Sequence, residues 1–209
     1  MTHIRIADRL IGKFPFLDDP SFVVGSIAPD CGKINPDGVS YVPEKDVTHF
    51  GRYREGRDYQ RLLSLINSDN YRFFLGYYAH ILTDDLWITN ILLPKKAQYL
   101  REFPDFYHFI MTQRANWFTL DKEYILMNPD DHAYGMLYKT ERFDNVYLSF
   151  QSKDAFTEHI AKVKNHYDDF CVSEDIPKYL TAHELEGFIS YAVPIVADKI
   201  NQCRNIYSD

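Results

Sequence analysis

Cysteine is scarce in this 209-residue chain, which has only Cys31, Cys171 and Cys203 and no Cys-x-x-Cys pair. An odd number of widely spaced cysteines argues against the disulfide framework of a secreted protein. We therefore expect reduced thiols, as in a protein that works inside a cell. Cys31 is expected to be a buried and inert thiol, although it follows Asp30 directly.

Long hydrophobic runs are also missing. The N-terminal segment MTHIRIADRLIGKF is interrupted by the charges of Arg5, Asp8 and Arg9, so it is typical of neither a signal peptide nor a membrane span. We find no lipidation signal. These absences favour a cytoplasmic location without stable membrane association.

Clusters of positive charge are absent. The formal net charge is −7, and the longest basic run is the pair Lys95–Lys96. Such a chain repels long nucleic acids and anionic bilayers on average. A small phosphate ester is still an acceptable substrate, because a bound metal ion outweighs the distant mean field. The sequence does not define an oligomeric state.

Several catalytic signatures are missing. The chain has no P-loop, no Gly-x-Ser-x-Gly elbow and no His-Asp dipeptide. His183-Glu184 is not followed by the second histidine that the zinc-protease signature requires. The corresponding catalytic templates therefore fit this sequence less well.

No segment alternates convincingly between apolar and polar residues, whereas helical spacing recurs along the chain. We therefore predict one all-α domain, a multi-helix bundle that spans residues 1–209. Residues 18–46 are expected to be irregular and residues 118–150 have no clear period. Pro94 is expected to separate two helices, and Thr181 with Glu184 matches a capping box. The predicted helices are His3–Lys13, Arg54–Asn67, Arg72–Leu92, Lys95–Trp117, Lys153–Phe170 and a last helix from Thr181 to about Ile206, kinked or divided at Pro194.

The segment FLGYYAHILTDDLW (Phe74–Trp87) carries the most chemical information. It is apolar nearly all round, which predicts a buried helix. His80 and Asp84 are four residues apart and would lie on one face of that helix. A buried carboxylate needs a partner, either a metal ion or a cation. Hydrogen bonding within the helix is the alternative, but it contributes only a few tenths of a kcal/mol. Asp85 lies about 100° round the helix and is expected to meet Arg114 or solvent.

Three further residues have the character of metal ligands. His3 opens the first predicted helix, Asp30 closes the run GSIAPD, and His49 stands in the tripeptide THF. Taken singly, each has an ordinary explanation, such as a solvent-exposed histidine or a turn aspartate. Together with His80 and Asp84 they form an ordered set.

In that order, GSIAPD, THF and GYYAHILTDDLW behind an N-terminal histidine resemble the bacterial zinc-dependent phospholipase C family. The chain looks more like that family's small intracellular hydrolase-like members than like its secreted enzymes. It is more distantly similar to the single-strand-specific zinc nucleases. The resemblance covers roughly residues 3–90 and implies the all-helical bundle of that family.

The resemblance also implies a ligand set and a reaction. Asp30, His49, His80 and Asp84 would bind one Zn²⁺, and His3 would bind a second Zn²⁺ that shares Asp84. One or two ions are expected, with Asp30 and Asp84 as the catalytic carboxylates. A metal-bound hydroxide would attack phosphorus.

The family's His-x-x-x-Glu pair has no match among the later histidines. The candidates for an additional ligand therefore stay open, with His183 slightly ahead because Glu184 and Glu186 accompany it. These candidates are His108, His132, His159, His166 and His183.

Two functions follow from these expectations. The first is a zinc-dependent phosphoesterase that hydrolyses a small phosphodiester or phosphomonoester, with Tyr77, Trp87 and Lys33 lining the substrate pocket. The second is a non-catalytic helical module in which a structural metal ion ties the N-terminal half together. Residues 118–209 match no motif and are expected to shape the pocket.

Overall fold

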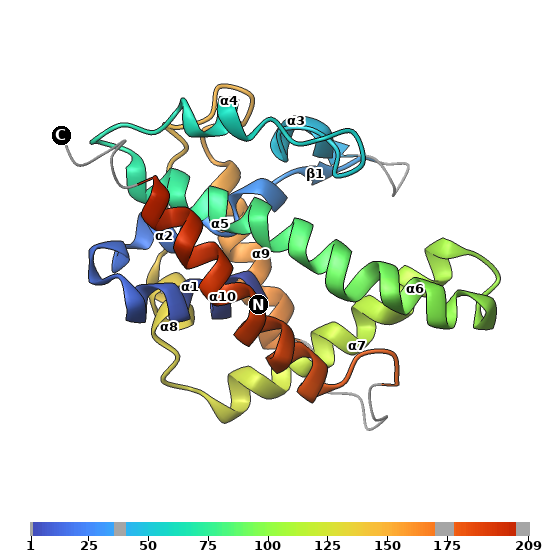
Figure 1. Ribbon diagram of the computed structural model, residues 1–209. Helices are drawn as coiled ribbons and strands as arrows, with labels where there is room; N and C mark the ends of the chain where they lie inside the picture. The colour runs from blue at the N-terminus through green and yellow to red at the C-terminus, as the bar shows by residue number, and fades with distance from the viewer. Residues whose placement is uncertain (1, 36–40, 170–177, 204–209) are drawn as a thin grey trace.

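The computed structural model describes residues 2–35, 41–169 and 178–203, and it confirms the all-α prediction (Figure 1). Within these residues the only β-structure is a short antiparallel pair, β1 (Lys33–Ile34) and β2 (Tyr41–Val42). Cys171 and the predicted helix ends at Phe170 and Ile206 lie outside the described residues. The α-helices are α1 (Thr2–Lys13), α2 (Pro20–Gly25), α3 (Lys45–Thr48), α4 (Tyr59–Leu63), α5 (Tyr71–Trp87), α6 (Leu93–Tyr99), α7 (Phe106–Met127), α8 (His132–Lys139), α9 (Ala155–Asp169) and α10 (Ala182–Gln202).

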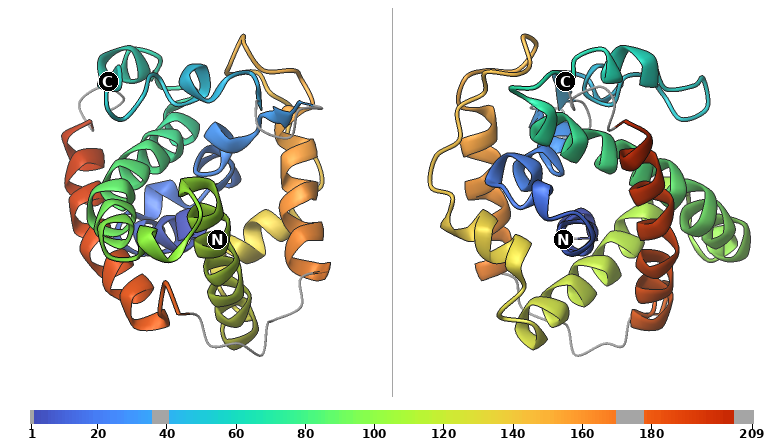
Figure 2. Two further views of the ribbon diagram at one scale, coloured as in Figure 1. Left: turned by 90° about the vertical axis from the view of Figure 1, so that its right-hand side faces the viewer. Right: turned by 60° about the vertical axis from the view of Figure 1, so that its left-hand side comes forward.

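Helix α5 is the central element of the bundle. It packs against α1, α2, α4 and α10 and runs on toward α6 (Figures 1 and 2). Most of its residues are buried, as the apolar sequence predicts. Among the described helices, none is long and apolar enough to cross a membrane.

Helices α2 and α5 approach each other backbone to backbone. A Cβ added at Gly25 would lie 2.1 Å from the carbonyl oxygen of Phe73, and one added at Gly76 would lie 2.1 Å from that of Phe22. Only glycine permits this contact. It places the C-terminal end of α2 directly beside the middle of α5, where His80 lies.

The first and last helices, α1 and α10, pack against each other. Arg5 and Arg9 of α1 pair with Glu186 of α10, and apolar residues of both helices lie in one core. The capping box of Thr181 and Glu184 is confirmed. Pro194 does not divide α10, which continues to Gln202.

Several predicted helix bounds are wrong, each for a local reason. The helix expected over Arg54–Asn67 is only α4, because Gly56 has a positive φ of 93° and Asp58 caps the helix start. The helix expected over Lys95–Trp117 is broken near Pro104, and α7 begins after the cap at Asp105. The region 118–150 contains the rest of α7 and all of α8.

Pro94 does not separate two helices as predicted. A π-helical turn, η3 (Ile88–Leu92), joins α5 to α6, and Pro94 falls in the first turn of α6. A proline is tolerated there, because it has no N–H to donate and the wider π-helical turn before it accommodates the missing hydrogen bond. The helical direction therefore continues past the predicted break.

Candidate metal centre

Helix α5 presents His80 and Asp84 on one face. The Nε2 atom of His80 lies 3.6 Å from Oδ2 of Asp84, and the His80 side chain is 1% exposed. Asp84 is 26% exposed and marks the solvent edge of the pair. The spacing of four residues thus has the geometric result that the sequence predicts.

Asp30 reaches this pair from the 3₁₀ turn η2 (Ala28–Asp30), which follows α2. Its Oδ2 lies 3.9 Å from Nε2 of His80, and its Oδ1 lies 3.7 Å from Nε2 of His49. The turn packs against both α5 and α3. The close approach of α2 to α5 therefore also brings the carboxylate of Asp30 to His80.

His49 lies where the short helix α3 ends. The N–H of Gly51 donates to the carbonyl of Asp46 and that of Phe50 to Val47, while Phe50 has a positive φ of 53°. These bonds form a Schellman motif. The Phe50 ring packs at 5.7 Å on Tyr77 of α5. This anchored turn holds Nε2 of His49 at 3.3 Å from Oδ2 of Asp84.

His3 comes from α1 and completes a five-residue cluster with Asp30, His49, His80 and Asp84. Its ring stacks on that of His80, with centroids 3.8 Å apart and planes 12° apart. Its Nε2 lies 3.5 Å from Oδ1 of Asp84. The two oxygens of Asp84 therefore face different histidines, an arrangement that would allow this carboxylate to bridge two ions.

The distances in the cluster match the size of a zinc site. In tetrahedral zinc sites with bonds of about 2.0–2.1 Å, neighbouring ligand atoms are about 3.4 Å apart. The pairs named above are 3.3–3.9 Å apart. Two overlapping groups have ligand atoms within 4.8 Å of one another: His3 with Asp30 and His80, and His49 with His80 and Asp84.

Hydrogen bonds orient two of the imidazoles. Nδ1 of His80 lies 2.8 Å from the carbonyl oxygen of Ser26, and Nδ1 of His49 lies 3.1 Å from that of Lys45. A carbonyl only accepts, so Nδ1 carries the proton in both rings. In the neutral ring the lone pair is then on Nε2, the atom that faces the carboxylates. Metal-bound histidines have this arrangement.

The cluster leaves buried polar atoms without hydrogen-bond partners. They are Nε2 of His80 and Nδ1 of His3. A buried acceptor without a donor costs about 1–3 kcal/mol. Nε2 of His80 lies 3.9 Å from Asp30 and 3.6 Å from Asp84, so a cation between these atoms would satisfy it.

The charges in the cluster shift the pKa values of its members. Burial alone would raise the pKa of Asp84, but His80 and the other imidazoles lower it well below its usual range. At Asp30, the Lys45 ammonium and the imidazoles likewise outweigh burial and lower the pKa. Burial lowers the pKa of His3 to about 3. The carboxylates outweigh burial at His80 and raise its pKa. Both carboxylates are therefore ionised and His3 is neutral at pH 7.

Of the five later histidines, His159 lies nearest to this chemistry. It is on α9, which packs against η2, and it is close enough to Asp30, Lys45 and His80 for their charges to act on its pKa. The preference for His183 is wrong, because that side chain is exposed at the start of α10. His108 pairs with Asp105 and His132 with Asp18, both at the surface, while the His166 ring packs on Phe118.

The three residues predicted to line a substrate pocket make other contacts in the structure. Tyr77 is fully buried and donates its hydroxyl hydrogen to the carbonyl of Thr48. Trp87 stacks on Trp117 at 4.7 Å and is also buried. Lys33 pairs with Glu158 of α9 at 2.8 Å. Both aromatic side chains are therefore part of the core, and Lys33 contacts α9 through Glu158.

Sequence reasoning missed two cations beside the cluster. Arg57, and not Arg114, meets Asp85 through Nε at 2.6 Å, and it donates to the carbonyls of His49 and Gly51. It thereby ties the His49 turn to α5. Lys45 pairs with Asp30. No spacing rule reveals either residue, because long cationic side chains reach partners far away in the sequence.

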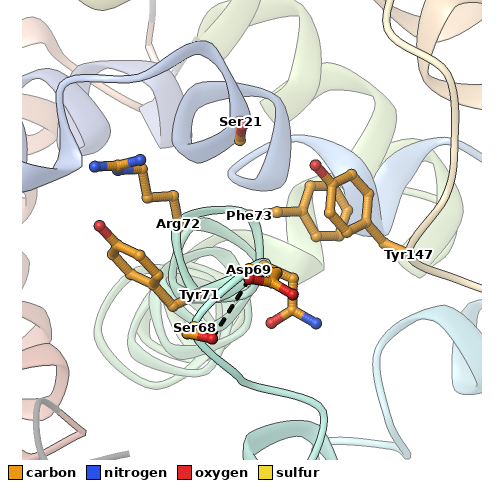
Figure 3. A pocket seen from close by; sticks show the side chains of 8 residues that line it. Ser21, Ser68, Asp69, Tyr71, Arg72, Phe73 and Tyr147 are labelled. Carbon is orange, nitrogen blue, oxygen red and sulfur yellow. Dashed lines mark hydrogen bonds between the residues drawn. The ribbon is translucent and has the colours of Figure 1, made fainter. Parts of the chain in front are cut away.

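Two hollows lie on the surface near α5. A groove of about 640 Å³ begins one helical turn beyond Asp84, and Ile88, Leu92 and Lys96 are among the residues that line it. A hollow of about 60 Å³ lies at the other end of α5, where Phe73 stacks on Tyr147 at 4.0 Å (Figure 3). Neither hollow includes a member of the five-residue cluster. The second is too small for anything but a few waters.

Comparison with protein-family profiles, with curated proteins and with solved structures finds no match to this chain. The resemblance to the zinc-dependent phospholipase C family therefore depends on the motifs alone.

The partly buried imidazole of His159 predicts an acid-sensitive fold. Burial lowers the pKa of His159 to about 4, whereas an unfolded histidine titrates near 6.5. Between these values the unfolded state binds more protons, so stability falls as the pH falls. In EDTA, the unfolding free energy of the wild type should fall between pH 7 and pH 4.5. In His159→Gln this fall should be smaller by about 2 kcal/mol. Urea denaturation at both pH values measures this difference. His108→Gln, at an exposed histidine, is the control and should leave it unchanged.

Proposed function

We propose that this chain is a metal-dependent hydrolase, with Zn²⁺ as the expected ion and a small phosphate ester as the substrate. The single observation that carries the proposal is the convergence of His3, Asp30, His49, His80 and Asp84 at distances of 3.3–3.9 Å. These residues come from four separate segments of the chain. Imidazole and carboxylate are the donors that Zn²⁺ prefers.

The exposure of the carboxylates favours a catalytic role over a purely structural one. Structural zinc sites are closed, whereas catalytic sites leave a coordination position open to water or substrate. Here His49 and His80 are buried and the His3 side chain is 14% exposed, whereas the Asp30 side chain is 41% exposed and that of Asp84 is 26% exposed. The solvent side of the cluster is therefore the side from which a substrate would approach.

The protein residues would divide the work as follows. The two carboxylates and the three histidines would hold the ion, while the carbonyls of Ser26 and Lys45 accept the Nδ1 protons of His80 and His49 and so leave Nε2 free to bind it. A bound divalent ion lowers the pKa of its water to about 7 and neutralises charge on the phosphoryl group. The nearby Arg57 keeps the His49 turn in register with Asp84.

Metal analysis and hydrolysis assays test the proposal together. Protein purified without chelators should contain at least one equivalent of a transition metal. It should hydrolyse bis(p-nitrophenyl) phosphate or p-nitrophenyl phosphate, and EDTA should remove the activity. Less than half an equivalent of metal would count heavily against the proposal. Bound metal without hydrolysis across a broad panel of phosphate esters would favour the structural module instead.

Metal binding should also raise thermal stability. Ligand at 100 times its Kd stabilises the native state by about 2.7 kcal/mol, which corresponds to a Tm increase of about 5–10 °C for a chain of this size. Differential scanning fluorimetry of the EDTA-treated protein with Zn²⁺, Mn²⁺ and Mg²⁺ measures the increase. Zn²⁺ should give the largest shift because the site has three imidazoles. An unchanged Tm with all three ions would contradict the assignment of the site.

A further inference from the structure

Lys45 takes part in the cluster in two ways. It is the first residue of α3, four positions before His49, and its carbonyl accepts the Nδ1 proton of His49 at 3.1 Å. Its ammonium group turns toward the other ligand segment and pairs with Oδ1 of Asp30. One residue thus orients a histidine through its backbone and neutralises a carboxylate through its side chain.

The ammonium lies on the solvent side of the cluster. The Lys45 side chain is 39% exposed, similar to Asp30 at 41%. Its Nζ lies 5.1 Å from the ring centroid of Tyr41 on β2. Arg57 lies 3.9 Å from Oδ2 of Asp84, but its closer partner is Asp85 at 2.6 Å. Lys45 therefore places a positive charge, at the end of a long side chain, on the side from which a substrate would approach.

Lys45 and a metal ion would compete for one atom. The Oδ1 atom of Asp30 that pairs with Lys45 also lies 3.7 Å from Nε2 of His49, on the ligand side of the cluster. A dication bound there repels an ammonium on the same oxygen. When the ion is bound, the ammonium needs another anion, and a phosphoryl group beside the ion supplies one.

We propose that Lys45 is the phosphate-binding residue of this site. In the ion-free protein its ammonium pairs with Asp30; in the ion-loaded protein it pairs with a phosphoryl oxygen of the substrate. This inference depends on the proposed function. Lysine suits the role, because its ammonium is a compact point charge on a flexible stem that binds phosphate without a fixed fork geometry.

The variant Lys45→Met gives two effects of opposite sign. Zinc affinity should increase about tenfold, because the competing ammonium is gone, and the affinity of the zinc-loaded protein for inorganic phosphate should fall about tenfold. Competition with a chromophoric chelator measures the first, and isothermal titration calorimetry the second. Lys45→Arg should keep phosphate affinity within about threefold of the wild type. Lys153→Met, at an exposed lysine that pairs with Asp144, is the matched control and should change neither.

A structural role for Lys45 gives a different pattern. If Lys45 only held Asp30 in place, Lys45→Met would weaken zinc binding and leave phosphate affinity unchanged, and either result overturns the inference. If Lys45→Met does not fold, Lys45→Gln removes the charge and keeps a polar contact. Failure of the wild type to bind zinc would refute the proposed function itself. If the wild type binds zinc but Lys45→Met has the same phosphate affinity as the wild type, only the role of Lys45 is refuted.

Discussion

Replacing Asp84 by Asn should reduce the hydrolysis of a phosphodiester by about 10³-fold or more and lower the bound metal below half an equivalent. Asparagine keeps the shape of the side chain but removes its charge. The charge matters twice at this position, because Oδ2 faces His49 and His80 while Oδ1 faces His3. A neutral amide cannot bridge two ions or balance their charge.

A surface pair gives the matched control for this experiment. Asp105 and His108 also form a carboxylate–imidazole contact within one helix, at 2.8 Å, but both are exposed. Asp105→Asn should leave activity and metal content unchanged, since asparagine caps α7 as well as aspartate does. Full activity and full metal content in Asp84→Asn would show that Asp84 is not a ligand.

The sequence predicts the five-residue cluster better than it predicts the residues that surround this cluster. His80 and Asp84 are four residues apart on a helix that is apolar all round, and this pattern leaves few alternatives. The ordered motifs then point to Asp30, His49 and His3, and the structure brings all five together. The residues that line a substrate pocket are harder to predict, because the same apolar helix carries Tyr77. From the sequence alone, its aromatic ring could equally face a pocket or the core.

Other elements could not be predicted because distant contacts decide them. Arg57 is one example, because its partners are Asp85 and the backbone carbonyls of the His49 turn. His159 is on α9, and nothing in its own segment indicates that α9 packs against η2. Local periodicity carries no information on such pairings. The same limit hides Lys45, whose partner is fifteen positions away.

The position of the cluster depends on the close contact between α2 and α5, so Gly76→Ala should disrupt both fold and site. The added methyl group would lie 2.1 Å from the carbonyl oxygen of Phe22 and 2.9 Å from the amide nitrogen of Ser26. Both obstacles are backbone atoms, so a side-chain rotation cannot relieve the clash. Overpacking of this kind should remove about 3 kcal/mol or more of stability, and the Tm should fall by about 6–12 °C.

The shift of α2 should also weaken metal binding. The carbonyl of Ser26, directly after α2, holds Nδ1 of His80 at 2.8 Å, and losing such a bond typically costs 10–100-fold in metal affinity. Gly187→Ala is the control, because a Cβ there meets nothing within 4 Å in the middle of α10. That variant should be neutral or stabilised by about 0.5–1 kcal/mol. If Gly76→Ala kept both the Tm and the zinc affinity of the wild type, α2 and α5 would not be in backbone contact, and the placement of Asp30 beside His80 would lose its physical basis.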